Sequence, residues 1–344
     1  MNREKIMDIV SRFNLPNYRR IQLMTAFYKR RLTSFEDIST LSVDLRSAIA
    51  AEYSVMSVEM VEVLDAADGR SYKASLRLID GALVESVLIR TKSNLWTTCI
   101  SCQVGCSVGC NMCATGSMGF LRDLTSEEIS DQVLFWHHLA DVGRVPSAPT
   151  NVVYMGMGEP FLNRVNLFDS LEELISGDCL NVGSRHISVS TCGVVDAFDE
   201  FATRFPQVNL SISLHAANDA LRDSLVPINR KWSLATLGAA VRDYLERCRR
   251  KVFFEYVMLD GVNDGDKELR ELESFLKSIG NRRLVHVNLI PYNDTNTGYA
   301  PSRESRIKRF IHGLEDGGWH VTRRRSLGDD VNAACGQLAG RGKI

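Results

Sequence analysis

The feature that most constrains the fold is a regular alternation of two kinds of segment from about residue 93 onward. Short apolar runs typical of β-strands are separated by longer segments whose apolar residues recur every three or four positions, as in amphipathic helices. Such alternation indicates parallel βαβ units. The predicted strands span residues 96–101, 150–157, 186–191, 208–215, 252–259 and 284–291, with a late one at 319–325. We therefore expect an α/β fold in which six units form an incomplete parallel (β/α)6 barrel.

The segments between the strands carry helix signals. Thr125 and Glu128 have the spacing of a capping box, which satisfies free backbone amides at the start of a helix. This box opens the first predicted helix of the barrel. The predicted helices span residues 126–140, 233–248, 266–279 and 302–316.

The first part of the chain has a different pattern. Segments with helical spacing come first, at residues 6–13, 18–30 and 35–53. Segments with strand-like alternation and Asp-Gly turns follow, at residues 72–80 and 83–90. We expect three domains: an N-terminal helical accessory domain over residues 1–53, a small β linker region over residues 54–92, and the catalytic barrel over residues 93–344.

Charge and hydropathy set limits on location and partners. The N-terminus lacks the apolar core of a signal peptide and no window resembles a membrane span, so we expect a cytoplasmic protein without membrane contact. The formal net charge of −1 gives no sign of a nucleic-acid partner. Three local basic clusters would form a phosphate-tracking face if the fold brings them to one side, and are otherwise solvated helix ends and strand edges. These clusters are Arg247, Arg249, Arg250 and Lys251; Arg303, Arg306, Lys308 and Arg309; and Arg323, Arg324 and Arg325.

The cysteines are the strongest chemical signal. Five of the nine lie between residues 99 and 113. An odd number of cysteines in a chain without a secretion signal disfavours a disulfide framework and favours metal binding or redox chemistry.

Cys106, Cys110 and Cys113 form a C-x-x-x-C-x-x-C motif just after the first predicted barrel strand. A structural zinc ion would need four ligands, and no second knuckle or histidine pair is evident. Three thiolates can instead hold three irons of a [4Fe-4S] cluster and leave the fourth open, where S-adenosylmethionine can chelate. The alternatives are a zinc-stabilised RNA-binding module and an electron carrier, although ferredoxin-type clusters use four cysteines.

The motif resembles that of the radical S-adenosylmethionine superfamily, and Gly158-Glu159-Pro160 after the next strand resembles its cofactor loop. From about Glu85 onward the chain is similar to the RlmN/Cfr family of RNA adenine methyltransferases, in segments such as TCISCQVGCSVGCNMCATGSMGF, SISLHAANDALRDSLVPINRK and GDDVNAACGQLAG. The resemblance implies that the three cysteines hold the cluster. It also implies a set of residues that bind S-adenosylmethionine, namely Gly158, Glu159, Ser190, Ser213, Leu214, His215 and Asn293. Without it, Ser190, Ser213 and His215 would be interpreted as ordinary polar groups at strand ends.

The resemblance further implies a mechanism with two molecules of S-adenosylmethionine per turnover. Cys335 takes a methyl group from the first, and a 5′-deoxyadenosyl radical from the second removes a hydrogen from that methyl. The resulting radical adds to an electron-poor adenine carbon, which joins protein and RNA covalently. Glu85 then acts as the base, and Cys99 displaces the sulfur of Cys335 to leave a disulfide. From composition alone, Glu85 would be an exposed strand carboxylate and Cys335 a buried apolar residue.

Within the family, two reactions on the same adenosine of 23S rRNA compete. Pro160 favours methylation at C2, with an adenosine beside some tRNA anticodons as a second substrate, whereas the C8 branch, which confers antibiotic resistance, has alanine there. The short N-terminal domain and the ATGSMGF segment lean toward the C8 branch. The resemblance also implies naked or early-assembly 23S rRNA as substrate, a flavodoxin or ferredoxin as electron donor, and a monomer.

Overall fold

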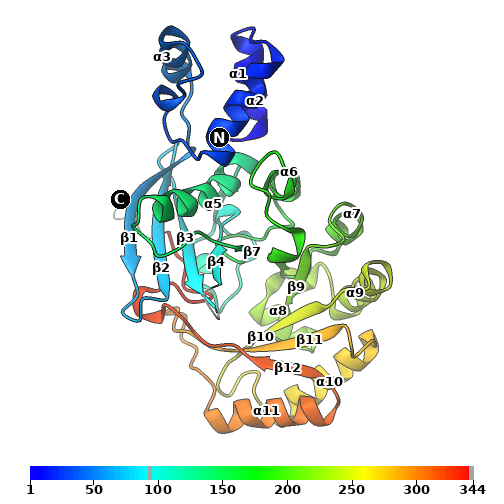
Figure 1. Ribbon diagram of the computed structural model, residues 1–344. Coiled ribbons are helices and arrows are strands. Elements are labelled where there is room, and N and C mark those ends of the chain that lie inside the picture. Colours follow the sequence, from blue (N-terminus) through cyan, green and yellow to red (C-terminus); the bar gives the residue numbers. More distant parts are fainter. Residues whose placement is uncertain (92–94, 341–344) are drawn as a thin grey trace.

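The computed structural model describes residues 1–91 and 95–340, and its centre is a sheet of ten strands. Seven of these are parallel and lie side by side in chain order along a curved row (Figure 1). They are β4 (Trp96–Cys99), β7 (Asn151–Tyr154), β8 (Ile187–Thr191), β9 (Asn209–Ser213), β10 (Val252–Met258), β11 (Val285–Pro291) and β12 (His320–Arg323). The row does not close on itself among the described residues. The prediction of an α/β fold with an incomplete parallel barrel is therefore confirmed.

Three antiparallel strands extend this sheet beyond β4. They are β1 (Val58–Asp65), β2 (Ser71–Leu78) and β3 (Leu83–Arg90), and β3 pairs antiparallel with β4 so that Val87 lies opposite Cys99. The segment expected to link two domains is thus hydrogen-bonded into the barrel sheet itself. This pairing brings the strand that carries Glu85 alongside the strand that ends at Cys99.

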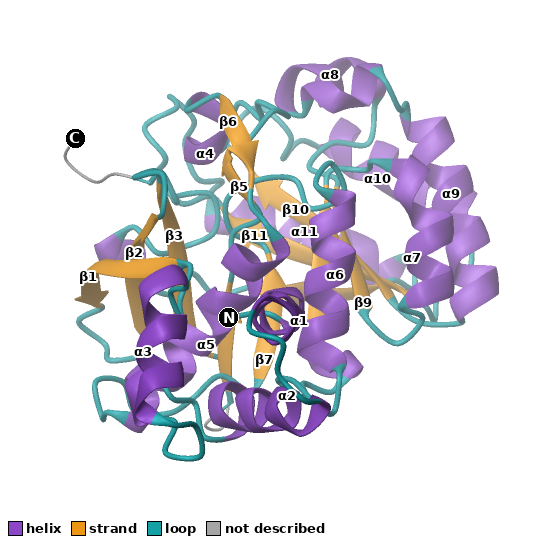
Figure 2. Ribbon diagram, turned by 90° about the horizontal axis from the view of Figure 1, so that it is seen from above, coloured by secondary structure: helices purple, strands orange, loops and turns teal. Residues whose placement is uncertain are grey.

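Helices cover the outer face of the curved sheet (Figure 2). They are α5 (Ser126–Asp141), α6 (Arg164–Ile175), α7 (Phe198–Arg204), α9 (Leu234–Cys248), α10 (Asp266–Ile279) and α11 (Glu304–Asp316). The short helix α8 (Asp219–Leu225) lies instead against the segment of the cysteine motif, where the Asn111 amide donates to the Leu225 carbonyl at 3.1 Å. The four predicted barrel helices match α5, α9, α10 and α11 to within two residues, and the capping box of Thr125 and Glu128 is present at α5. No helix in the described part of the chain is both long and apolar enough to cross a membrane.

The N-terminal helices form a small cluster on top of the sheet (Figure 1). They are α1 (Arg3–Arg12), α2 (Asn17–Met24), which continues as a π-helical turn to Lys29, and α3 (Val43–Glu52). The predicted helix over residues 35–53 is wrong in its first half, because only a 3₁₀ turn forms at Phe35–Asp37. Ser42 then starts a new helix by accepting a hydrogen bond from the Leu45 amide at 3.4 Å. The cluster docks on α6, where the Tyr28 hydroxyl donates to the Glu173 carboxylate at 2.7 Å.

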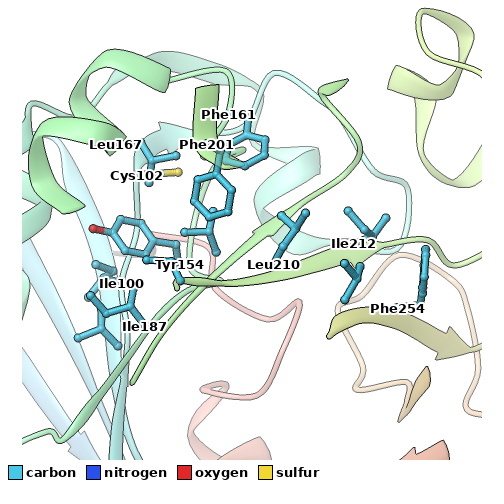
Figure 3. Close-up of a cluster of buried hydrophobic side chains, with 14 of the residues drawn as sticks. Ile100, Cys102, Tyr154, Phe161, Leu167, Ile187, Phe201, Leu210, Ile212 and Phe254 are labelled. Carbon is cyan, nitrogen blue, oxygen red and sulfur yellow. The ribbon is translucent and has the colours of Figure 1, made fainter. Parts of the chain in front are cut away.

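The core between sheet and helices fixes the loop that follows β7. Figure 3 shows Tyr154, Phe161 and Phe201 among the buried side chains there, and the rings of Phe161 and Phe201 lie 5.2 Å apart. Because Tyr154 and Phe161 flank residues 155–160, their burial holds both ends of this loop. A hairpin of β5 (Gln103–Gly105) and β6 (Phe120–Asp123) lies next to the loop, and the short helix α4 (Ala114–Ser117) lies within the hairpin connection.

Candidate active site

A cavity with an empty volume of about 1060 Å³ lies at the carboxyl ends of the parallel strands. This is where parallel α/β barrels place their active sites, because the loops that follow the strands meet there. Each strand from β7 to β12 contributes lining residues at or just after its end, including Tyr154, Ser190, Ser213, Val257, Asn293 and Arg324.

The three cysteines of the motif line one side of this cavity. They lie in the connection between β5 and α4, which is tied to the hairpin by a hydrogen bond from the Cys106 amide to the Gly119 carbonyl at 2.7 Å. Burial raises the pKa of Cys106 to about 12 and that of Cys113 to about 11, and the adjacent thiols add to both shifts. Thiols held this way need a cation in order to bind as thiolates, so the donor set fits an iron-sulfur cluster.

Among residues 1–91 and 95–340, no group of three or more His, Cys, Asp or Glu side chains has an arrangement that could hold a single metal ion.

Gly158 and Glu159 lie beside the cysteines, in the loop after β7. Gly158 has φ of +101°, and a side chain there would lie 2.6 Å from the Cβ of Gln103, so only glycine fits. The Glu159 carboxylate is buried and accepts hydrogen bonds from the amides of Cys192 at 2.6 Å and Phe161 at 3.1 Å. Burial raises its pKa, and the Cys192 bond opposes that rise. A held carboxylate beside the cluster site can bind an ammonium group.

Polar groups at the ends of β8 and β9 complete this wall. The hydroxyls of Ser190 and Ser213 lie 3.2 Å apart and both face the cavity. His215 is buried with φ of +59°, and its Nδ1 accepts from the Val257 amide at 3.2 Å, which leaves the proton on Nε2. Burial and the Arg222 charge lower its pKa to about 3, so the ring is neutral. The Leu214 side chain is fully buried and does not line the cavity.

The segment that carries Cys335 lines the cavity and is held by hydrogen bonds to its backbone carbonyls. The side-chain amide of Asn293 donates to the Cys335 carbonyl at 3.1 Å, and the backbone amide of Ala114 donates to the Gly336 carbonyl at 2.8 Å. Cys335 is exposed, and its exposed surface faces the cavity. Desolvation by the cavity walls raises the pKa of its thiol, and the Arg324 guanidinium opposes that rise.

An ion pair in the cavity was missed by the sequence analysis. Arg324 Nη1 lies 3.3 Å from Glu255 Oε2, and Glu255 also accepts from the side-chain amide of Asn288 at 2.9 Å. Arg324 was assigned only to a basic cluster, although a carboxylate inside the apolar run of β10 could have indicated a buried partner. Burial raises the pKa of Cys99 to about 12, the Cys335 thiol adds to the shift, and Arg324 opposes it. One guanidinium therefore acts on both thiols.

Glu85 and Cys99 do not line the main cavity. Glu85 borders a second cavity of about 570 Å³, where its carboxylate lies 3.2 Å from Lys73 Nζ and accepts from the Ala339 amide at 2.8 Å. Leu338 lines the first cavity, and its neighbours Gln337 and Ala339 line the second. The C-terminal segment is thus the wall between Glu85 and the main cavity.

The three basic clusters do not share one face. Residues 247–251 end α9 and precede β10, which places them at the amino ends of the parallel strands, opposite the cavity. Arg250 is bonded there to Asn209, at the start of β9, at 2.6 Å. The Arg323 cluster follows β12 at the cavity edge. The interpretation that all three clusters form one phosphate-tracking face is therefore wrong.

Comparison with known proteins agrees with this site. The profile of the Radical SAM superfamily matches residues 100–272. The "Probable dual-specificity RNA methyltransferase RlmN" of Enterococcus faecalis is 36% identical over 340 residues, which cover 98% of this chain and 94% of the relative. The chain belongs to the RlmN/Cfr family of radical SAM RNA methyltransferases. Its homologue in Streptococcus agalactiae, with the same name, is 38% identical over 323 residues, 93% of this chain and 87% of the relative.

A solved structure gives the same family. A radical SAM methyltransferase from Sphaerobacter thermophilus matches with a TM-score of 0.93 and 38% identity, covering 99% of this chain and 98% of that chain. Membership of the radical SAM family implies a [4Fe-4S] cluster and S-adenosylmethionine as cofactors.

Proposed function

We propose that this protein methylates C2 of an adenosine in 23S rRNA, and of an adenosine beside the anticodon of some tRNAs, through a covalent intermediate with Cys335. One observation carries the proposal. Cys335 faces the same cavity as the three clustered thiols and the loop of Gly158 and Glu159. A methyl group on its sulfur would therefore lie in the compartment where a radical can be generated.

Under this proposal, different walls of the cavity bind the cluster and S-adenosylmethionine. Cys106, Cys110 and Cys113 would hold the cluster. The Glu159 carboxylate and the Gly158 backbone would bind the amino group of S-adenosylmethionine, with the rest of the pocket formed by Ser190, Ser213, Leu214, His215 and Asn293. Leu214 would act only through its backbone, because its side chain is buried in the core. When bound, the cluster and S-adenosylmethionine supply a carbon-centred radical able to remove a hydrogen atom.

The remaining steps depend on the protein's own side chains. The Cys335 thiol must lose its proton to accept a methyl group, and Arg324 stabilises the thiolate that results. Cys99, whose pKa is also lowered by the Arg324 charge, would later displace the Cys335 sulfur. Glu85 would take the proton from the substituted carbon. Because its carboxylate is bonded to the Ala339 amide, this step would require the C-terminal segment to move aside.

The choice of C2 over C8 is supported by Pro160 and by the relatives, which are named as probable dual-specificity RNA methyltransferases of the RlmN type. Methylation at C8 is the alternative within the family. We also propose naked or early-assembly rRNA as the form bound, a flavodoxin or ferredoxin as electron donor, and a cytoplasmic monomer. Residues 1–53 would be an accessory domain, whose buried apolar side chains form a cluster shared with Leu134 of α5 and Cys179.

The test is mass spectrometry of nucleosides after anaerobically reconstituted protein reacts with an rRNA fragment and S-adenosylmethionine carrying a trideuterated methyl. We expect 2-methyladenosine with two deuterium atoms, because one is lost from the S-methyl group of Cys335. Two deuterium atoms in 8-methyladenosine would assign the C8 reaction. Three would mean direct methyl transfer, and absence of methylated adenine in an iron-free, zinc-containing protein would favour the RNA-binding module.

A further inference from the structure

We propose that the Cys192 thiol donates a hydrogen bond to the sulfur of Cys110 and thereby raises the reduction potential of the cluster. This inference rests on the proposed role of Cys110 as an iron ligand. The two sulfur atoms lie 3.8 Å apart, and both residues line the main cavity. Cys192 itself had no role in the sequence analysis, because it lies outside the motif.

The backbone of Cys192 is held on both sides of its side chain. Its amide donates to the Glu159 carboxylate at 2.6 Å, and its carbonyl accepts from Arg222 Nη2 at 2.7 Å. Gly193, with φ of +104°, turns the chain immediately afterwards, and its amide donates to the Thr191 hydroxyl at 3.1 Å. The main chain of Cys192 is thus held beside the cysteine motif by contacts that do not depend on its own side chain.

The direction of the hydrogen bond follows from the chemistry of the ligand. A cysteine sulfur bound to iron carries no proton, so Cys110 can only accept and Cys192 must donate. Hydrogen bonds to ligand sulfurs are among the factors that set cluster potentials, because they stabilise the more negative, reduced state. The fully buried Arg222 guanidinium, bonded to the carbonyl of Cys192, adds positive charge on the same side.

The experiment is a potentiometric titration of the reconstituted holoenzyme, followed through the electron paramagnetic resonance signal of the reduced cluster. In Cys192→Ala the donor is lost, and we expect the ratio of reduced to oxidised cluster at a fixed potential to fall about tenfold, a shift of about 59 mV toward negative values for a one-electron couple. Cys192→Ser keeps a hydroxyl donor and should retain most of the wild-type potential. Cys192→Val, which fills the space without a donor, should behave like the alanine variant.

Several outcomes would overturn the inference. An unchanged potential in both the alanine and valine variants would mean that Cys192 only fills space. Loss of iron from these variants would make Cys192 a ligand instead of a donor. The matched control is Cys248→Ala, which removes a half-buried thiol on α9 far from the motif and should leave the potential unchanged. Cys110→Ala tests the underlying assignment separately: if it binds a normal cluster, the proposed ligand set fails whatever the Cys192 variants show.

Discussion

Replacing Glu173 by glutamine should remove a pH-dependent part of the protein's stability. Glu173 lies on α6 with its side chain buried, and it accepts hydrogen bonds from the hydroxyls of Tyr28 at 2.7 Å and Ser130 at 3.2 Å. Burial raises its pKa from 4.5 to about 7, against the opposing effect of the Tyr28 bond. This carboxyl therefore joins the N-terminal helices to the barrel in a protonation state that depends on pH.

The sign and size of the change in unfolding free energy with pH follow from the pKa shift of Glu173. A carboxyl whose pKa is higher in the folded state favours folding when protonated, so its contribution is full below about pH 4.5 and is lost as the pH rises through about 7. At about 1.4 kcal/mol per pKa unit, the whole change is on the order of 3 kcal/mol, of which about 2 kcal/mol falls between pH 5.5 and 8. Glutamine keeps an acceptor for Tyr28 and cannot titrate.

The assay is urea unfolding of wild type and Glu173→Gln at several pH values from 5.5 to 8. The difference in unfolding free energy between the two proteins should shift by about 2 kcal/mol across this range, in favour of the variant at high pH. Glu172→Gln is the matched control, because Glu172 is the exposed neighbour on the same helix, and its difference from wild type should stay nearly constant. Parallel pH curves for wild type and Glu173→Gln would refute the reasoning.

Four further predictions concern the reaction. Cys335→Ala should block transfer of the first methyl group to the protein, and a methylated variant in an intact-mass spectrum would contradict this. Cys99→Ala should accumulate protein crosslinked to RNA on a denaturing gel, and absence of the crosslink would remove Cys99 from the resolving role. Arg324→Gln should slow methylation of Cys335 and move the midpoint of its rate-pH profile upward, because the guanidinium lowers the pKa of that thiol; an unmoved midpoint would show that the charge is not felt. Intact ribosomal subunits should be methylated more slowly than naked rRNA, because the proposed target is buried in them, and equal rates would count against this.

Much of the fold was predictable because its signals are local. Strand and helix periodicities repeat along the barrel, and the capping box at Thr125 marks a helix start within four residues. The break in the helix predicted over residues 35–53 involves contacts with residues outside that segment, which local sequence signals do not report. Phe35 is buried against Phe27, with ring centroids 5.4 Å apart, and the chain leaves helical geometry at Ile38, where ψ is 75°.

The candidate site was predictable only in part, because its remaining contacts join residues far apart in the chain. The cysteine motif and the loop of Gly158 and Glu159 are compact sequence patterns. The ion pair of Glu255 with Arg324 spans 69 residues, and the bond from the Ala339 amide to Glu85 spans 254. Periodicity carries no information on such pairs, so the separation of Glu85 from the main cavity could only be found in three dimensions.

The way the sheet ends has a consequence for the solution behaviour of the protein. A barrel that began at β4 would leave a row of backbone amides open to pairing with another chain. The strands β1 to β3 cover that row, and the new outer strand β1 carries exposed Glu59 and Glu62 and an irregular register at Met60. At the opposite margin, the exposed Arg323 of β12 is bonded to Glu304. Charge and a bulge thus protect the open sheet from edge-to-edge aggregation. A closed barrel needs no such protection because it has no free edge strand.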